Sequence, residues 1–351
     1  MRIGIPREIK EGERRVSLLP SETRELALAG HDVFVEHDAG AGVGAGDDEY
    51  HRSGAQCGTA AETWGSPLVV KVKEMLEGDL ARAQAGQAIF GFQQLPRFPE
   101  RTRALAHSGV TAIAFELVRD HHGGYPLLAP MSAIAGRMAV EATWRFLPES
   151  PSVIVLGAGN AGLSAARTAR DRGGRVAVLT RTTRSRDAAI AKGFQSDIAT
   201  RQAVEAAALD ADLVVGAVLR PGEPTPKLLQ RSLVRRMKQG AVIADVCIDG
   251  GGVAETSRPT THAEPTYVEE GVLHYAIPNI PGADPVASAS AISRAALPFV
   301  ASLASLGIAG ALRADPRLRA AVLLWNGRVT HPVIAEETRL PYTALSDADL
   351  A

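Results

Sequence analysis

The chain has 351 residues, a length that suggests two domains of ordinary size. Its 38 basic and 39 acidic side chains nearly cancel, which argues against nucleic acid or a membrane surface as a partner. Cys57 and Cys247 form no metal-binding pattern, so we expect no metal site and two free thiols. The charged N-terminus is unlike a signal peptide, and no uninterrupted apolar stretch approaches the ~20 residues that cross a bilayer. We therefore expect a cytoplasmic protein.

Strand-like and helix-like segments alternate over the first third of the chain. Short apolar runs predict strands at 2–6, 31–40, 67–75, 87–95 and 110–118. Helices are predicted from Pro20 to Leu28 and from Pro99 to Ser108. This alternation predicts a parallel α/β sheet.

A long helix from Ala129 to Phe146 then precedes a second α/β unit. Its strands are predicted at 152–156, 175–180, 211–218, 241–249 and 273–279, and a further helix from Leu297 to Leu312. The tail after Ala314 contains the strand-like run 322–331 but no nucleotide-binding motif of its own. Its most economical place is therefore back on the first domain.

The loop after the strand at 152–156 matches the pattern GxGxxG, with Gly157, Gly159, Asn160, Ala161 and Gly162. The first glycine permits the tight turn, the second lets backbone approach a pyrophosphate, and the third lets helix pack on strand. The alternative is a purely structural glycine turn. We interpret the loop as a dinucleotide site and predict a two-domain α/β fold. A Rossmann-type, doubly wound dinucleotide-binding domain (127–299) is inserted in a discontinuous α/β substrate domain (1–126 and 300–351), with a cleft between the two.

The end of the next strand favours NADP(H) over NAD(H). An NAD site presents a carboxylate to the ribose 2′-hydroxyl about 20 residues after the loop. Here the strand ends at Thr180, with Arg181 and Arg184 following and no carboxylate before Asp187. Hydroxyls and guanidinium groups suit a 2′-phosphate. The alternative is a solvated basic surface loop.

Several long stretches give the sequence a family resemblance. They are IGIPREIKEGERRVSLLP, LVVKVKE, PLLAPMSAIAGRMAVEA, VIVLGAGNAG, ADLVVGAVLRPGEPTPKL, DVCIDGGGVAETSRPTTH and HYAIPNIPGADP. In these the chain resembles the alanine dehydrogenase family, which includes the transhydrogenase nucleotide-binding subunit. More distantly it resembles N5-(carboxyethyl)ornithine synthases and saccharopine dehydrogenases. The resemblance implies an NAD(P)-dependent amino-acid dehydrogenase that transfers hydride between nicotinamide and the α-carbon of an amino or imino acid. It also implies a homo-oligomer, a dimer or hexamer.

The resemblance assigns roles to individual residues. Arg15 would bind the substrate carboxylate, and Lys73 would hold its carboxylate and carbonyl oxygens. Asp249 would lie near the nicotinamide ribose and the substrate, and Met131 would line the substrate pocket. Ser132, Val218, Val246, Ile277 and Asn279 would contact the cofactor, with Asn279 closing over the nicotinamide side. The alternatives are a surface ion pair for Arg15, a turn for Asp249 and plain core for Met131.

Two features depart from the alanine dehydrogenases. Gln94 stands at the catalytic position of their acid/base histidine, and a glutamine cannot take up a proton near neutral pH. Asp249 or Lys73 would then carry the proton. Their Gly-rich insert before the dinucleotide strand is also missing, as it is in the carboxyethylornithine synthases. The alternative function is therefore an NADPH-dependent imine- or opine-forming reductase that joins an amino acid to a 2-oxo acid. A catalytically inactive dinucleotide-binding regulator is the alternative from another class.

Overall fold

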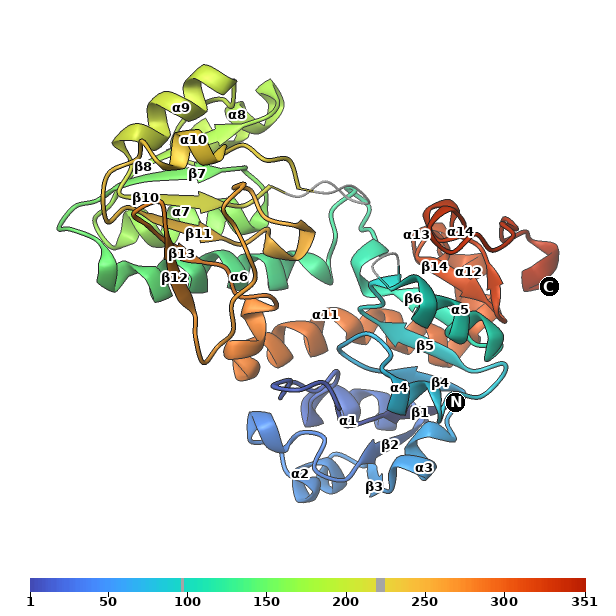
Figure 1. Cartoon of the computed structure of the whole chain (residues 1–351). Helices are drawn as coiled ribbons and strands as arrows, with labels where there is room; N and C mark the ends of the chain where they lie inside the picture. The colour runs from blue at the N-terminus through green and yellow to red at the C-terminus, as the bar shows by residue number, and fades with distance from the viewer. Residues whose placement is uncertain (96–97, 219–224) are drawn as a thin grey trace. The chain divides into compact units, whose positions relative to one another are not determined.

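The chain folds into two compact units (Figure 1). The computed structural model describes residues 1–95, 98–218 and 225–351. Unit 1 comprises Met1–Leu128 and Asp284–Ala351, and unit 2 comprises Ala129–Ala283. Unit 2 is thus inserted in unit 1, and the first boundary lies close to the expected one.

The second boundary lies earlier than we expected. It precedes helix α11 (Pro285–Leu306), so the expected boundary at residue 299 falls inside a continuous helix. The expected helix start at Leu297 lies just before Pro298, a residue that fits the first turn of a helix. In the structure Pro298 lies inside α11, and the Asp284 carboxylate caps the helix by accepting the Ala287 N–H at 3.2 Å. Gly307, with φ of 73°, then separates α11 from α12 (Ile308–Ala314).

Unit 1 is built on an eight-stranded sheet with the order β15-β14-β6-β5-β4-β1-β2-β3. Its strands are β1 (Arg2–Ile5), β2 (Asp32–Glu36), β3 (Gln56–Gly58), β4 (Leu68–Val70), β5 (Ala88–Gly91), β6 (Thr111–Ala114), β14 (Val322–Trp325) and β15 (Arg328–Val329). Strands β1 to β6 pair in parallel, whereas β14 is antiparallel to both β6 and β15. Figure 1 shows the red C-terminal strand β14 beside β6, so the tail completes the sheet of the first domain. Every residue of β4, β5 and β6 is buried, which explains their continuous apolar sequences.

Short helices connect these strands. They are α1 (Pro20–Leu28), α2 (Asp47–Arg52), α3 (Ala60–Trp64), α4 (Glu77–Leu80), α5 (Pro99–His107), α13 (Pro316–Arg319) and α14 (Pro332–Thr338), with the 3-10 turns η1 (Ala41–Val43), η3 (Phe115–Leu117) and η7 (Ala348–Leu350). The structure confirms the predicted helices α1 and α5.

Helix α11 is largely apolar, although Arg294 and several serines interrupt it. Within the described residues it is the one helix long and apolar enough to cross a membrane, although the sequence showed no uninterrupted apolar run of that length. Such a helix is weak evidence for a membrane, because the core helices of soluble proteins pass the same test. Its buried residues include Ile292, Ala296, Val300 and Leu303, and it packs against α1, η1 and β4 of the same unit.

Unit 2 is a doubly wound sheet with the order β12-β13-β11-β10-β7-β8-β9. Its strands are β7 (Ser152–Leu156), β8 (Arg175–Thr180), β9 (Gln195–Ile198), β10 (Leu213–Gly216), β11 (Val242–Asp245), β12 (Thr266–Glu269) and β13 (Val272–Tyr275). Only β12 is paired antiparallel among these described strands. The strand order reverses between β7 and β10, and ligands of such sheets bind at that switch point.

Alternate residues of β7 enter two separate cores, one on each face of this sheet. Val153 and Val155 pack with residues of α6 (Leu128–Thr143) and α7 (Asn160–Asp171), and the core includes Ala189 of α8 (Thr183–Ile190). Ile154 and Leu156 pack with α9 (Arg201–Asp210) and α10 (Arg231–Val234). Helices therefore cover both faces, as the predicted Rossmann-type fold requires. The 3-10 turns η4 (Trp144–Phe146), η5 (Ile248–Gly250) and η6 (Ile280–Ala283) complete unit 2.

Candidate functional site

The predicted cofactor-binding residues of unit 2 gather at one edge of its sheet. Gly157 follows β7, Thr180 ends β8, Val218 follows β10, Val246 follows β11 and Ile277 follows β13. These strands are parallel neighbours, so their carboxyl ends meet at the same edge. The structure thus brings together positions that lie far apart in the sequence.

The glycine loop has the geometry of a dinucleotide cradle. Gly157 has φ of 107°, and a Cβ there would lie 2.4 Å from the Ala217 carbonyl oxygen. A Cβ at Gly162 would lie 1.9 Å from the Gly157 carbonyl oxygen, so α7 packs on β7 only with glycine at this place. A Cβ at Gly159, in contrast, would meet no atom within 4 Å. Gly159 directly precedes the first turn of α7, where Asn160 and Ala161 lie, and an uncrowded loop before a helix N-terminus fits a pyrophosphate.

Two exposed guanidinium groups follow β8, that of Arg181 before α8 and that of Arg184 in the first turn of α8. Arg181 and Arg184 are exposed, with no partner among the described residues. Thr180 differs from our expectation, because its side chain is buried and its hydroxyl donates to the Thr182 carbonyl at 3.1 Å. The neighbouring strand β9 also contributes a carboxylate, Asp197, which the sequence of β8 and the residues directly after it do not contain. Asp197 pairs in register with Leu179, and its Oδ1 accepts the Ile198 N–H at 2.7 Å.

The loop that carries Asp249 is organised by a buried carboxylate. Asp245 accepts the N–H groups of Cys247 and Val253 at 3.1 and 2.7 Å. Burial raises the pKa of Asp245, and these hydrogen bonds counter that effect. The exposed Asp249 accepts the Asn279 N–H through Oδ2 at 3.4 Å, and Asn279 has a left-handed φ of 57°. The structure therefore places Asp249 and Asn279 together.

Three other predicted contacts of unit 2 are fixed by local packing. Val218 donates its N–H to Cys247 Sγ at 2.9 Å, so this free thiol is part of the loop scaffold. Met131 is buried in α6, and Ser132, next to it, is half-buried. The stretch that follows Val218 in the family motif, residues 219–224, lies outside the described residues.

In unit 1, polar residues follow the carboxyl ends of four adjacent parallel strands. Glu8 follows β1, Lys73 follows β4, Gln94 follows β5 and Glu116 follows β6. The strand order reverses between β1 and β4, so this edge too contains a switch point. The arrangement brings together Lys73 and Gln94, which we predicted, and two glutamates that we did not.

Arg15 is held in a buried ion pair. Its Nε donates to Glu13 Oε1 at 2.6 Å and its Nη2 donates to Oε2 at 2.5 Å. Both side chains are buried, so the ion pair of Arg15 does not lie on the surface, as the alternative considered from the sequence would have it. A guanidinium fixed on one edge in this way has a defined orientation, as binding of a carboxylate requires.

Lys73 is a buried lysine among charges of both signs. Its side chain is 6% exposed, and Nζ lies 3.6 Å from Glu74 Oε2. Burial lowers the pKa of Lys73; Glu74 opposes this effect, and Lys10 and Arg15 add to it. Glu74 in turn accepts a hydrogen bond from Lys10 Nζ at 2.6 Å. The ammonium is therefore a poorly solvated charge, suited to stabilising a negative oxygen.

Gln94 is fixed through its backbone. It has φ of 48°, and its N–H donates to Glu116 Oε1 at 2.7 Å. The Gln93 N–H lies 3.2 Å from both oxygens of the same carboxylate. Burial raises the pKa of Glu116, while these backbone hydrogen bonds and Lys73 lower it. Glu8 and Glu116 were not predicted, because charged residues after strands are common. Only the order of the strands in the sheet shows which of these residues lie close together.

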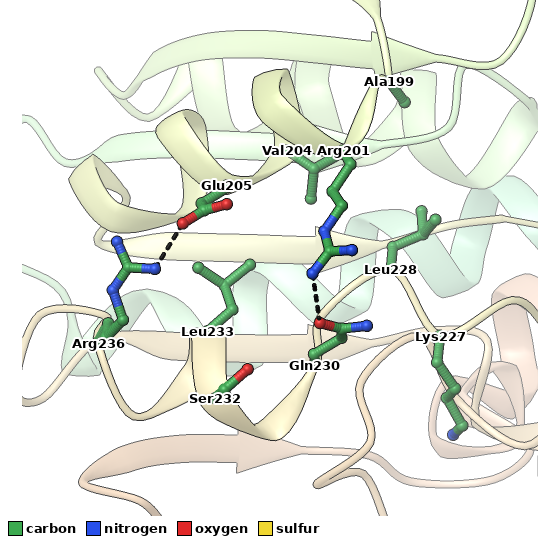
Figure 2. Close-up of a pocket in the computed structure, with 10 residues that line it drawn as sticks. All are labelled: Ala199, Arg201, Val204, Glu205, Lys227, Leu228, Gln230, Ser232, Leu233 and Arg236. Atoms are coloured by element: carbon green, nitrogen blue, oxygen red, sulfur yellow. Dashed lines mark hydrogen bonds and ion pairs between the residues drawn. The ribbon is translucent and has the colours of Figure 1, made fainter.

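One depression in unit 2 lies apart from the predicted residues. It has a volume of about 270 Å³ and is lined by residues of α9, α10 and the segments beside them (Figure 2). Arg236 pairs with Glu205 at 2.5 Å, and Arg201 donates to Gln230 at 3.1 Å. None of the predicted cofactor-binding residues lines it. Among the described residues no cluster of His, Cys, Asp or Glu could hold a metal ion.

Unit 2 is a doubly wound domain with a glycine cradle, and it is inserted in an α/β domain that has buried cations after its strands. These features together define a dinucleotide-dependent oxidoreductase. Comparison with known families makes the assignment specific. The chain belongs to the alanine dehydrogenase/PNT family, because residues 4–135 match its N-terminal domain and residues 137–332 its C-terminal domain.

Individual relatives cover nearly the whole chain. It is 41% identical to the alanine dehydrogenase of Halomonas elongata, over 97% of this chain and 98% of that protein. It is 38% identical to the alanine dehydrogenase of Mycobacterium tuberculosis, over 98% of both. A solved L-alanine dehydrogenase matches with a TM-score of 0.91, 37% identity and full coverage of both chains. A transhydrogenase from Sinorhizobium meliloti, at 24% identity, matches with a TM-score of 0.83 over 95% of this chain and 99% of that one, and shows the shared fold.

Proposed function

We propose that this protein is an amino-acid dehydrogenase that interconverts alanine, or a similarly small amino acid, with its 2-oxo acid and ammonia. The observation that carries the proposal is the buried cation pair of unit 1. Burial lowers the pKa of Lys73, and the nearby charge of Arg15 contributes to the lowering; each of the two cations has its own glutamate, Glu74 and Glu13. The identity to named alanine dehydrogenases supports the same substrate.

The two cations have separate tasks in this chemistry. Arg15 binds the substrate carboxylate through its guanidinium, which the ion pair with Glu13 orients. Lys73 stabilises the negative charge that develops on the substrate oxygen. A bound nicotinamide supplies or accepts the hydride, and the cradle of Gly157, Gly159 and Gly162 would hold its dinucleotide.

The proton must be carried without a histidine at position 94. The side-chain amide of Gln94 can only donate and accept hydrogen bonds. We propose Asp249 as the group that handles the proton, since its carboxylate is exposed and its loop is fixed by Asp245 and Asn279. Lys73, with its lowered pKa, is the second candidate.

Gln94 also favours a second candidate function. A preformed imine needs less proton transfer than a carbinolamine does, so an NADPH-dependent reductase that joins an amino acid to a 2-oxo acid would tolerate a glutamine here. The two functions differ in the nitrogen source. Steady-state assays with pyruvate and either ammonia or a diamino acid separate them, because only the second function requires the diamino acid.

For the cofactor we propose NADP(H) in preference to NAD(H). The exposed guanidinium groups of Arg181 and Arg184 support a 2′-phosphate, whereas Asp197 on the neighbouring strand would favour a 2′-hydroxyl. Equal or better affinity for NADH in calorimetric titration would contradict the proposal. By likeness to the family we also propose a cytoplasmic homo-oligomer, a dimer or hexamer, and a monomer in light scattering at micromolar concentration would contradict that assembly.

A further inference from the structure

The first lysine of the K-V-K motif is more deeply buried than the second. Lys71 is 1% exposed, and its Nζ lies 2.6 Å from Asp79 Oδ2 and 3.5 Å from Glu8 Oε2. The same ammonium donates to the Glu74 carbonyl at 3.3 Å. Because the Glu8 and Asp79 side chains are 2% and 1% exposed, the three groups form a dry ionic cluster.

Both carboxylates of this cluster bind backbone on either side of Lys73. Glu8 Oε1 accepts the N–H groups of Val72 at 2.5 Å and of Lys73 at 3.2 Å. Asp79 Oδ2 accepts the Leu76 N–H at 3.0 Å, at the start of α4. The segment that presents Lys73 is therefore tied at both ends to groups that Lys71 holds.

The positive charge of Lys71 helps Glu8 to remain ionised and so to accept the backbone N–H groups of Val72 and Lys73. Burial raises the pKa of Glu8, and Lys71 is the main group that opposes the rise, while Glu13 and Asp79 add to it. Among the described residues, Glu8 Oε2 has no hydrogen-bond partner, so its compensation comes from the Lys71 ion pair. A buried carboxylate that loses its counter-charge takes up a proton and becomes a weaker acceptor for backbone N–H groups.

We propose that Lys71 is a positioning residue for Lys73. Its ammonium joins Glu8 to Asp79, and the two carboxylates fix the backbone from Val72 to Leu76 that presents the second lysine. This inference rests on the proposed function, since Lys73 contacts the substrate there. Lys71 itself contacts no substrate.

Amide hydrogen exchange tests the positioning without relying on activity. We expect Lys71→Met to raise the exchange rates of the Val72 and Lys73 amides by about tenfold or more, because their acceptor is weakened. The amides of β5 should keep their rates. Lys192→Met is the matched control, since that lysine is exposed and lies in unit 2. Wild-type exchange rates for Val72 and Lys73 in Lys71→Met would overturn the proposal.

Kinetics test the consequence for the reaction. With pyruvate, ammonia and NADPH, Lys71→Met should lower kcat and raise KM for pyruvate, for a combined loss of about 10²-fold in kcat/KM, while KM for NADPH stays unchanged. In a folded Lys71→Met variant, a KM for NADPH that rises as much as the KM for pyruvate would contradict the proposal. If the wild type itself turns over no amino acid, the proposed function fails, whereas the exchange measurement still decides the positioning.

A triple variant keeps the test informative if Lys71→Met does not fold. Glu8→Gln, Lys71→Met and Asp79→Asn together remove the cluster's charges and keep both oxygen acceptors for the backbone. The proposal predicts a kcat/KM within about tenfold of the wild type for this variant. A loss as large as that of Lys73→Ala would overturn it, because Lys71 would then act by more than positioning.

Discussion

Two alanine substitutions in the glycine loop separate packing from cofactor binding. Gly162→Ala would place a Cβ 1.9 Å from the Gly157 carbonyl oxygen and 3.3 Å from Val155 Cγ1. Helix propensity favours alanine by about 1 kcal/mol, whereas overpacking costs about 1–3 kcal/mol. Because the clash is with backbone, we expect the upper end of that range. The free energy of unfolding should fall by about 2 kcal/mol on balance.

Gly159→Ala is the matched variant with the opposite expectation. Gly159 has φ of −76°, which alanine adopts freely, and its Cβ would meet no atom within 4 Å. The free energy of unfolding should stay unchanged or rise by about 0.4–1 kcal/mol. The methyl group would, however, occupy the side of the loop that the pyrophosphate approaches. We expect at least about a tenfold loss of NADPH affinity, which is about 1.4 kcal/mol.

Chemical denaturation and calorimetric titration of both variants measure the two quantities separately. Binding of NADPH to Gly159→Ala as tight as to the wild type would show that the loop is a structural turn. A Gly162→Ala variant as stable as the wild type would show that the contact between α7 and β7 is looser than the structure has it.

Three other predictions follow from the sites. Lys73→Ala and Asp249→Asn should each lower turnover by about 10²-fold or more with pyruvate and ammonia, and turnover within a few fold of the wild type would show that the proposed site is wrong. Arg181→Glu and Arg184→Glu together should shift the preference from NADPH toward NADH, as measured by the ratio of kcat/KM values; an unchanged ratio would place the 2′-phosphate elsewhere. Burial lowers the pKa of His274, which is 0% exposed and accepts a hydrogen bond from Thr256, so the folded state binds fewer protons than the unfolded state. The free energy of unfolding should therefore fall as pH drops below about 6.5, and His274→Gln should remove that part of the slope in denaturation curves across pH, whereas equal slopes would contradict it.

Local patterns predicted much of the fold. Short apolar runs gave the parallel strands, and the glycine spacing located the β7 to α7 turn. The start of α11 could not be predicted, because Pro298 has the features of a helix start and the true cap at Asp284 precedes a stretch rich in serine and alanine. Tertiary packing decided between these two starts.

The candidate site was predicted less completely than the fold. Resemblance pointed to Lys73 and Gln94, but Glu8 and Glu116 join them only because β1, β4, β5 and β6 are neighbours in the sheet. Strand order is a long-range property that spacing along the chain does not contain. The strand that ends at Thr180 was predicted with its observed bounds, but the burial of the Thr180 side chain was missed, because its hydrogen bond to the Thr182 carbonyl and its pairing with β9 are not visible in the sequence of the strand.

The most direct test of the proposed function is the initial rate of nicotinamide oxidation by the purified wild-type protein with pyruvate and ammonia, using NADPH and NADH in parallel. We expect turnover that requires both pyruvate and ammonia, is faster with NADPH and falls by about 10²-fold in Lys73→Ala. The absence of turnover with either cofactor for any small 2-oxo acid and ammonia would contradict it, and so would a rate that Lys73→Ala leaves unchanged.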